Sequence, residues 1–201
     1  MSKKVLHIIS SPRTDVSVSR KLGNAIVEKV KEKYPDSILK ERDLAKSLFP
    51  HLEEVHINSF FTPAENHSPE QEIAIKHSDE AIAELKEADI IVIDSPMYNF
   101  SITSTLKAYL DHIVRAGVTF RVTENGAEGL LKNKKVYVAF SGGSVYSEGI
   151  FQAYDFNIPY LKTLLGFLGI IDITVFRAEG LNVPNVKETA FEKGIESIAI
   201  A

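Results

Sequence analysis

The residues best suited to chemistry lie in one short stretch, Pro96-Met97-Tyr98-Asn99-Phe100. An apolar segment, 90–94, precedes this stretch, and a helical pattern begins shortly after it at Ser104. Two aromatic rings, a thioether and an amide in such proximity suit contact with a flat, amphipathic ring. The alternative is that Tyr98 and Phe100 only pack into the core at a strand-to-helix turn. Taken alone, the stretch favours neither interpretation.

A second polar stretch follows the first apolar segment of the chain. Ser10, Ser17 and Ser19 offer hydroxyls, Arg13 offers a positive charge, and a helical pattern opens near Ser19. Backbone amides at a helix start are unpaired and attract anions. The stretch lacks both G-x-x-x-x-G-K-[ST] and G-x-G-x-x-G, so it does not resemble a triphosphate or dinucleotide loop. A hydroxyl-rich loop without those glycines suits a monophosphate, such as that of flavin mononucleotide (FMN). The alternative is that Ser19 is only an N-cap and Ser17 only a loop residue.

A third stretch, Ser141-Gly142-Gly143-Ser144-Val145-Tyr146, follows the apolar segment 136–140. Consecutive glycines let a backbone approach a ligand closely and present its amides. A glycine pair also serves ordinary turns, so this stretch is weak evidence by itself. Three suitable stretches, each placed after an apolar segment, make a stronger case together.

The elements that would position these stretches follow from the apolar pattern. β-Branched segments of the kind found in central strands occur at 5–9, 38–42, 90–94, 136–140 and 173–176. Between them lie helical patterns at 19–33, from Pro69 with Ser68 and Gln71 as a capping box, from Pro159 to Gly169, and at 186–199. This alternation predicts an α/β fold of parallel βαβ units. We expect a flavodoxin-like three-layer sandwich with a five-stranded parallel sheet in the order 2-1-3-4-5, whose carboxyl edge brings the three stretches into one crevice.

Composition limits the classes of function. The chain has 201 residues, 44% hydrophobic and 25% charged, which predicts one globular domain spanning 1–201. A net charge of −4, from 23 basic and 27 acidic residues, argues against nucleic acid as a partner. The absence of cysteine excludes thiolate chemistry. No apolar run is long enough for a signal peptide or a membrane span, so we expect a cytoplasmic protein without a membrane partner. The segment 45–67 reads as a long loop, which predicts a functional or interface role.

Other chemistries find less support in the sequence. His51 and His56 are five residues apart and would diverge on a helix, so we expect surface histidines and no metal site. His112 is expected to have a structural role or to face solvent. Ser10 or Ser141 as a hydrolytic nucleophile needs a base nearby and has no G-x-S-x-G elbow. A hydrolase acting on a phosphodiester and an FMN-holding electron carrier without turnover are kept as alternative functions.

Longer stretches of the chain resemble one family. Besides 96–100, these are Leu106-Lys107, Arg115-Ala116-Gly117-Val118-Thr119-Phe120 and Thr123-Glu124-Asn125-Gly126, and together they closely resemble the FMN-dependent NADH azoreductases. The resemblance extends over nearly the whole chain, including 165–170 and 178–180, and is weakest over 48–67. Members of that family are flavodoxin-like homodimers that also reduce quinones, and some were once labelled acyl carrier protein phosphodiesterases.

The resemblance implies one FMN per subunit and a set of residues that contact it. It places the phosphate on Ser10, Ser17, Val18 and Ser19. It places the isoalloxazine ring against Pro96, Met97, Tyr98, Asn99 and Phe100, with Ser141, Gly142 and Gly143 on the far side. The family often has an arginine between the serine and the glycine of that last loop, whereas Gly142 follows Ser141 directly here. On the substrate side, the resemblance implies Phe120, reaching toward the flavin of the partner subunit, together with Phe60 and Tyr146.

The resemblance also implies a reaction in two steps at one site. NADH or NADPH stacks on the ring and passes a hydride to flavin N5, after which a quinone or an azo compound takes its place and is reduced. The cofactor carries the chemistry, and the protein binds and tunes it. No side chain is required as an acid, so none is assigned as catalytic. Backbone amides near Asn99 and Gly142 are expected to stabilise negative charge that develops on the ring.

Overall fold

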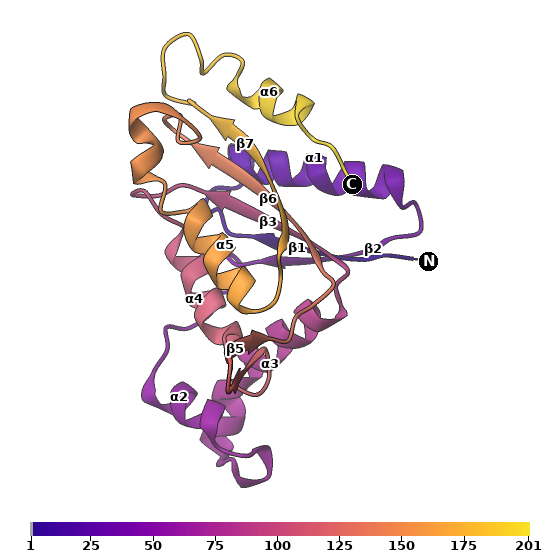
Figure 1. Ribbon diagram of the computed structural model, residues 1–201, viewed down its shortest axis with the longest axis vertical. Coiled ribbons are helices and arrows are strands. Elements are labelled where there is room, and N and C mark those ends of the chain that lie inside the picture. The colour runs from indigo at the N-terminus through magenta and orange to yellow at the C-terminus, as the bar shows by residue number, and fades with distance from the viewer. Residues whose placement is uncertain (1) are drawn as a thin grey trace.

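The computed structural model describes residues 2–201 and contains a five-stranded parallel sheet between two layers of helices (Figure 1). The strands follow the order β2-β1-β3-β6-β7. Their bounds are Lys4–Ile9 for β1, Ile38–Asp43 for β2, Ile90–Pro96 for β3, Lys135–Gly142 for β6 and Asp172–Glu179 for β7. Counted along the chain, this is the predicted order 2-1-3-4-5. All seven residues of β3 are buried, as a central strand covered on both faces requires.

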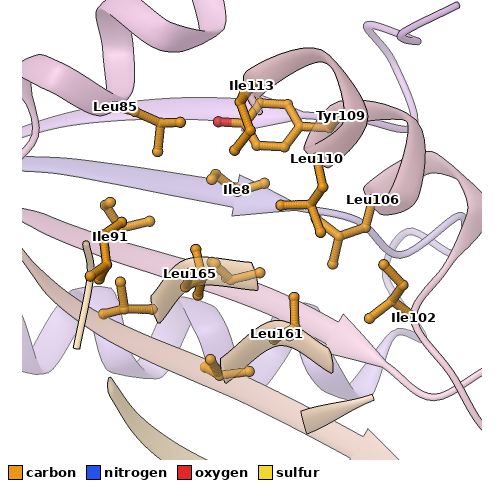
Figure 2. Packing of buried hydrophobic residues seen from close by; sticks show 14 of the residues in the cluster. Ile8, Leu85, Ile91, Ile102, Leu106, Tyr109, Leu110, Ile113, Leu161 and Leu165 are labelled. Atoms are coloured by element: carbon orange, nitrogen blue, oxygen red, sulfur yellow. The ribbon is translucent and has the colours of Figure 1, made fainter. Parts of the chain in front are cut away.

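Two separate apolar cores hold the helices to the sheet. On one face, α1 (Val18–Lys33) and α6 (Ala190–Glu196) cover a core that includes Leu22, Ile26 and Val92. On the other face lie α3 (Pro69–Glu87), α4 (Ser104–Ile113) and α5 (Ile158–Phe167). Figure 2 shows this second core, in which side chains of all three helices meet Ile8 of β1 and Ile91 of β3. The strands are thereby fixed from both sides, and their carboxyl ends share one edge.

The helix ends follow local signals in the sequence. At α3, the capping box is present as predicted, because Ser68 Oγ accepts from Gln71 N and Gln71 Oε1 accepts from Ser68 N. At α1, the N-cap is Ser17 rather than Ser19, and its Oγ accepts from Arg20 N at 3.3 Å. After α5, Gly169 has a φ of 96°, the left-handed conformation that suits glycine just beyond a helix.

The segment 45–67 is not the open loop that the sequence predicts. It contains the helix α2 (Glu54–Phe61) and a 3₁₀ turn η1 (Ala64–Asn66), and α2 lies beside α3 (Figure 1). An unrecognised capping box starts α2, in which Glu53 N donates to His56 Nδ1 at 3.0 Å. His56 is therefore buried, which corrects the expectation of a surface histidine, whereas His51 is exposed. The acid and the histidine together make a helix start that serine-based signals do not reveal.

Two further differences concern the second half of the chain. A hairpin of β4 (Phe120–Thr123) and β5 (Gly126–Gly129) follows α4, and the apolar pattern did not predict it because both strands are short and half exposed. The last helix covers only Ala190–Glu196 of the predicted 186–199, because turns occupy the residues before it. Within residues 2–201, no helix combines the length and the apolar character needed to cross a membrane.

Candidate functional site

A cavity of about 340 Å³ opens at the carboxyl edge of the sheet. It is bounded by the three stretches that follow β1, β3 and β6, which the sequence predicted would meet. Eight of the residues proposed from the sequence line it, namely Ser17, Val18, Pro96, Met97, Tyr98, Ser141, Gly142 and Gly143. The remaining lining comes from Ser11, Arg13, Val16, Leu181 and Asn182. Met97 N donates to Ser141 O at 2.8 Å, so the second and third stretches are joined directly.

The start of α1 forms one end of the cavity. The first amides of a helix have no helical carbonyl within reach, and among residues 2–201 those of Val18 and Ser19 donate to no other acceptor. Ser17 Oγ lies 3.3 Å from Ser19 Oγ, so two hydroxyls accompany the free amides. Arg13 is exposed at the rim and adds a positive charge. Free amides, hydroxyls and a cation at the positive end of a helix dipole match the donors that a phosphate monoester needs.

Ser10 occupies a different position from the other three phosphate candidates. Its side chain is fully buried, and its Oγ donates to the carbonyl oxygen of Asp94 at 2.6 Å. The hydroxyl therefore ties the end of β1 to β3 and does not line the cavity. Thr105 of α4 donates to the carbonyl oxygen of Ser10 at 3.2 Å, which fixes the loop from the other side.

The turn after β3 is strained. Tyr98 and Ser101 exchange two backbone hydrogen bonds of 2.9 and 3.0 Å, and the two residues between them have positive φ angles, 48° at Asn99 and 70° at Phe100. Such a turn normally carries asparagine followed by glycine. A phenylalanine in the glycine position costs free energy, and strain of this kind concentrates at functional sites. Tyr98 and Phe100 remain substantially exposed, so the interpretation that they only fill the core does not hold.

A buried asparagine that the sequence analysis missed holds this turn in place. Asn157 is fully buried, and its Oδ1 accepts from Ser95 Oγ at 2.8 Å while its Nδ2 donates to Ser101 O at 3.3 Å. The preceding Phe156 N donates to Phe100 O at 3.0 Å. The segment before α5 thus supports both ends of the strained turn. In the sequence, the only signal at Asn157 is its position before Pro159. That pattern predicts a helix start, not a side chain that supports another loop.

Close packing explains the two glycines of the third stretch. A Cβ on Gly143 would lie 2.6 Å from Asn182 Nδ2, and one on Gly142 would lie 3.1 Å from the ring of Tyr146. Asn182 N also donates to Gly143 O at 2.8 Å, so the segment after β7 closes over this stretch. Tyr146 is nearly buried and packs against Phe140 behind Gly142, so it supports the cavity wall from outside. No sequence signal identified Asn182.

The remaining sequence-predicted residues lie outside this cavity. Asn99 lines a neighbouring cavity of about 560 Å³ on the other side of Tyr98, together with residues at the start of α4. Phe120 is on the β4–β5 hairpin, where its ring lies 4.6 Å from that of Phe167 at the far end of α5. Phe60 is on α2 and packs against His112. The chain by itself therefore does not bring Phe120 or Phe60 to the crevice.

The sheet beneath the cavity contains a buried acid. Asp94 is fully buried, and burial raises the pKa of its carboxyl to about 6, an effect that the neighbouring His7 partly offsets. His112, by contrast, lies in the core between α2 and α4, where desolvation lowers its pKa. Within residues 2–201 no group of three histidine, cysteine, aspartate or glutamate side chains is arranged to hold a metal ion.

These features fit FMN. A phosphate monoester matches the free amides and hydroxyls at the start of α1, and an aromatic ring matches the crevice between Tyr98 and the glycine pair. Gly142 and Gly143 line the cavity with backbone alone, and a larger residue does not fit at either position because its Cβ would be crowded by Tyr146 or Asn182. In open α/β sheets, this carboxyl edge is where ligands bind.

The comparisons with known proteins lead to the same class. The family described as having a flavodoxin-like fold matches residues 3–199. Among solved structures, an azoreductase from Bacillus anthracis superposes with a TM-score of 0.90 at 31% identity, covering 98% of this chain and 96% of that one. An FMN-dependent NADH-azoreductase of the same species in complex with FMN gives a TM-score of 0.85 at 28% identity, covering 96% and 97%.

Curated relatives identify the family more closely. A protein of Herminiimonas arsenicoxydans named FMN-dependent NADH:quinone oxidoreductase is 50% identical over 89% of this chain and 87% of its own length. A protein of the same name from a Nostoc species is 45% identical over 95% and 92%. The chain belongs to the family of FMN-dependent NADH:quinone oxidoreductases with the flavodoxin-like fold. The family resemblance noted in the sequence is thereby confirmed.

Proposed function

We propose that this chain is an FMN-dependent NADH:quinone oxidoreductase that also cleaves aromatic azo bonds by reduction. The observation that carries the proposal is the cavity at the carboxyl edge, where free helix amides stand at one end and the strained aromatic turn at the other. When bound, FMN would supply the two-electron redox chemistry that links NADH to the acceptor. The protein has to bind, orient and tune it.

The start of α1 binds the phosphate. The amides of Val18 and Ser19 would donate to its oxygens, Ser17 would add a hydroxyl that Ser19 Oγ contacts from inside the protein, and Arg13 would add a positive charge at the rim. Ser10 contributes through the loop that its hydrogen bond to Asp94 holds in place. This anchorage fixes the position of the ring, because the loops that flank it are joined to the same sheet edge.

The strained turn and the glycine pair orient the ring. Tyr98 and Met97 present an aromatic face and a thioether to it, and Gly142 and Gly143 allow a close backbone approach from the far side. Among residues 2–201, the amides of Asn99 and Gly143 donate to no protein acceptor. A donor fixed in advance in this way stabilises negative charge on the pyrimidine part of the ring, so we assign the tuning role to the amide of Gly143, because Asn99 lines the neighbouring cavity.

A second copy of the chain completes the substrate side. Aromatic side chains that face solvent cluster at the strained turn beside the crevice, with exposed fractions of 46% for Phe100, 49% for Tyr154 and 59% for Phe156. A cluster of exposed aromatic groups beside a ligand cavity is typical of an interface. We infer a homodimer in which Phe120 of one subunit reaches the crevice of the other. Light scattering after gel filtration should give about twice the mass of one chain.

The test of the proposed function is the visible spectrum of the purified protein. After addition of FMN and removal of the excess, the flavin absorbance should be retained, should bleach with NADH under anaerobic conditions, and should return when a quinone is added. An azo dye should restore it more slowly and lose its own colour. A protein that retains no FMN at micromolar concentration contradicts the proposal. Bleaching without return on either acceptor would instead favour a simple electron carrier.

A further inference from the structure

A buried pair of ionisable side chains lies directly behind the start of α1. His7 of β1 and Asp94 of β3 are both fully buried, and the His7 Nε2 to Asp94 Oδ1 distance is 2.8 Å. Neither the other carboxylate oxygen, Asp94 Oδ2, nor the other ring nitrogen, His7 Nδ1, has a hydrogen-bond partner among residues 2–201. A buried polar atom without a partner is costly, so its presence requires an explanation.

The pair is in contact with the helix that we assign to phosphate binding. A Cβ on Gly23 of α1 would lie 1.8 Å from Asp94 Oδ1, so only glycine lets the helix come this close. Gly23 follows Ser19 by four residues, which is about 6 Å along a helix axis. On the other side, Ser10 Oγ donates to the backbone carbonyl of Asp94. The pair thus touches both segments that form the phosphate end of the cavity.

Charged side chains from α1 and β2 lie close to the His7–Asp94 pair. Arg20 of α1 forms an ion pair with Asp43 of β2, in which Arg20 Nη1 lies 2.8 Å from Asp43 Oδ2. From β2, Glu41 Oε1 lies 3.9 Å from His7 Nδ1 and is half exposed. With Asp94 ionised, the charges of Asp94, Arg20 and Asp43 sum to −1. One additional proton on the pair makes that set neutral.

We propose that the His7–Asp94 pair is a positioning element for the phosphate end of the site and that it takes up a proton when the FMN phosphate binds. The inference rests on the proposed function, because it takes the start of α1 as the phosphate site. A dianion placed about one helical turn beyond Ser19 repels the ionised carboxylate behind the same helix. The free positions on the pair, at His7 Nδ1 and Asp94 Oδ2, accept the proton that relieves this repulsion.

The size of the effect follows from the distance. Burial already raises the pKa of Asp94 to about 6, so the pair is mostly ionised but close to titration at neutral pH. Two negative charges about 10 Å away, at an effective dielectric constant of about 40 because the cavity is open to solvent, raise the pH at which the pair titrates by about one. Binding at pH 7 should therefore add roughly half a proton to the pair.

The experiment measures the protons exchanged when FMN binds to the apoprotein. Calorimetric titrations at pH 7 in two buffers with different ionisation enthalpies give this number directly. Wild type should take up roughly half a proton more than Asp94→Asn, which keeps a hydrogen-bonding group beside His7 but cannot ionise. Riboflavin, which lacks the phosphate, should cause no uptake in either protein. Glu84→Gln is the matched control, because Glu84 is another buried acid but lies on α3, on the opposite face of the sheet.

The outcomes separate this inference from the proposed function. Tight FMN binding with equal proton exchange in wild type and Asp94→Asn would assign the pair a merely structural role and overturn the inference alone. If Asp94→Asn does not fold, the proton exchange of wild type with FMN and with riboflavin tests the inference without the variant. A net release of protons with FMN, as the phosphate alone would produce on binding as a dianion, contradicts the inference, and uptake with FMN but not riboflavin supports it. Failure of wild type to bind FMN overturns both proposals.

Discussion

The two ends of the sheet each have a cavity, and the larger one is not the proposed FMN site. The cavity at the amino end measures about 840 Å³ and lies where β1, β3, β6 and β7 begin, whereas the cavity at the carboxyl end measures about 340 Å³. Four lysines line the amino end, so it offers far more charge than the single arginine at the carboxyl end. Size and charge alone would select the wrong region.

The difference lies in which polar groups are already satisfied. At the amino end, Lys135 pairs with Asp172 at 2.5 Å, Lys132 pairs with Glu128 at 2.6 Å, and Lys134 Nζ donates to two backbone carbonyls that end α3. At the carboxyl end, the first amides of α1 have no protein acceptor and the turn after β3 is strained. Unsatisfied donors and stored strain, rather than volume, are therefore the features that favour the carboxyl end as the proposed ligand site.

The largest expected effect comes from replacing Asn157, which supports the strained turn. Asn157→Ala removes a buried amide and leaves Ser95 Oγ and Ser101 O without their partner, which should lower the free energy of unfolding by about 3 kcal/mol. FMN affinity should fall as well, because the turn loses its fixed position. Urea unfolding of the apoprotein and quenching of FMN fluorescence measure the two effects.

A matched change at the amino end provides the control. Tyr137 is also fully buried, and its hydroxyl accepts from Ala201 N at 3.1 Å. Tyr137→Phe should cost no more than about 1 kcal/mol, because the backbone amide that it releases is near solvent. Its FMN affinity should equal that of wild type. Equal losses of FMN affinity in both variants would show that the two ends do not differ in the way proposed.

The second expected effect tests the free amides of α1 without disturbing the helix. Val18 is the first residue of α1, a position where proline is well tolerated, and Ser17 before it has the extended conformation that precedes proline, with φ −73° and ψ 117°. Val18→Pro deletes one amide donor. A charge-assisted hydrogen bond contributes about 2 kcal/mol, so FMN affinity should fall by about 30-fold.

Two comparisons make this result specific. Riboflavin has no phosphate, so its affinity should be the same in Val18→Pro and wild type. Glu54→Pro introduces proline at the first position of α2, far from the cavity, and should leave FMN affinity unchanged. If Val18→Pro weakens riboflavin as much as FMN, the start of α1 does not hold the phosphate.

Local pattern predicted most of the fold and the meeting of the three stretches at one cavity. The five strands, their order and the carboxyl-edge location all followed from apolar segments alternating with helical patterns. This succeeded because parallel strands buried on both faces, such as β3, need continuous apolar runs, and their connections are restricted. The three ligand stretches were identified because each directly follows such a strand.

The parts that sequence reasoning missed depend on contacts between distant segments. Asn157 supports Ser101 across 56 residues, and Asn182 closes over Gly143 from the far side of β7. The burial of His7 and Asp94 side by side depends on the register between β1 and β3, which no local pattern shows. An isolated asparagine or histidine has no periodicity, so its role becomes visible only in the folded chain.

A smaller effect is expected at the strained turn itself, where a substitution should raise the free energy of unfolding, whereas Asn157→Ala should lower it. Phe100 has a φ of 70°, and Phe100→Gly should raise the free energy of unfolding of the apoprotein by about 1 kcal/mol. The same change removes an aromatic ring from the rim of the crevice, so FMN should dissociate faster. Asn133 at the amino-end cavity has a similar φ of 61°. Because asparagine tolerates this conformation, Asn133→Gly should change neither property appreciably. Stability that falls in Phe100→Gly would show that the turn is not strained.

The smallest expected effect compares one charge at each end. Arg13 and Lys132 are both cations beside a cavity, but Lys132 pairs with Glu128 and Arg13 has no acidic partner among residues 2–201. Arg13→Gln should weaken FMN by about threefold at low salt, and the difference should shrink at 0.5 M salt because exposed charges are screened there. Lys132→Gln should leave FMN affinity within about twofold at either salt concentration and change stability by less than about 0.5 kcal/mol. Titrations of both variants at both salt concentrations measure this difference. Equal responses would mean that the field of the whole protein attracts FMN, whereas a response confined to Arg13 places the attraction at the start of α1.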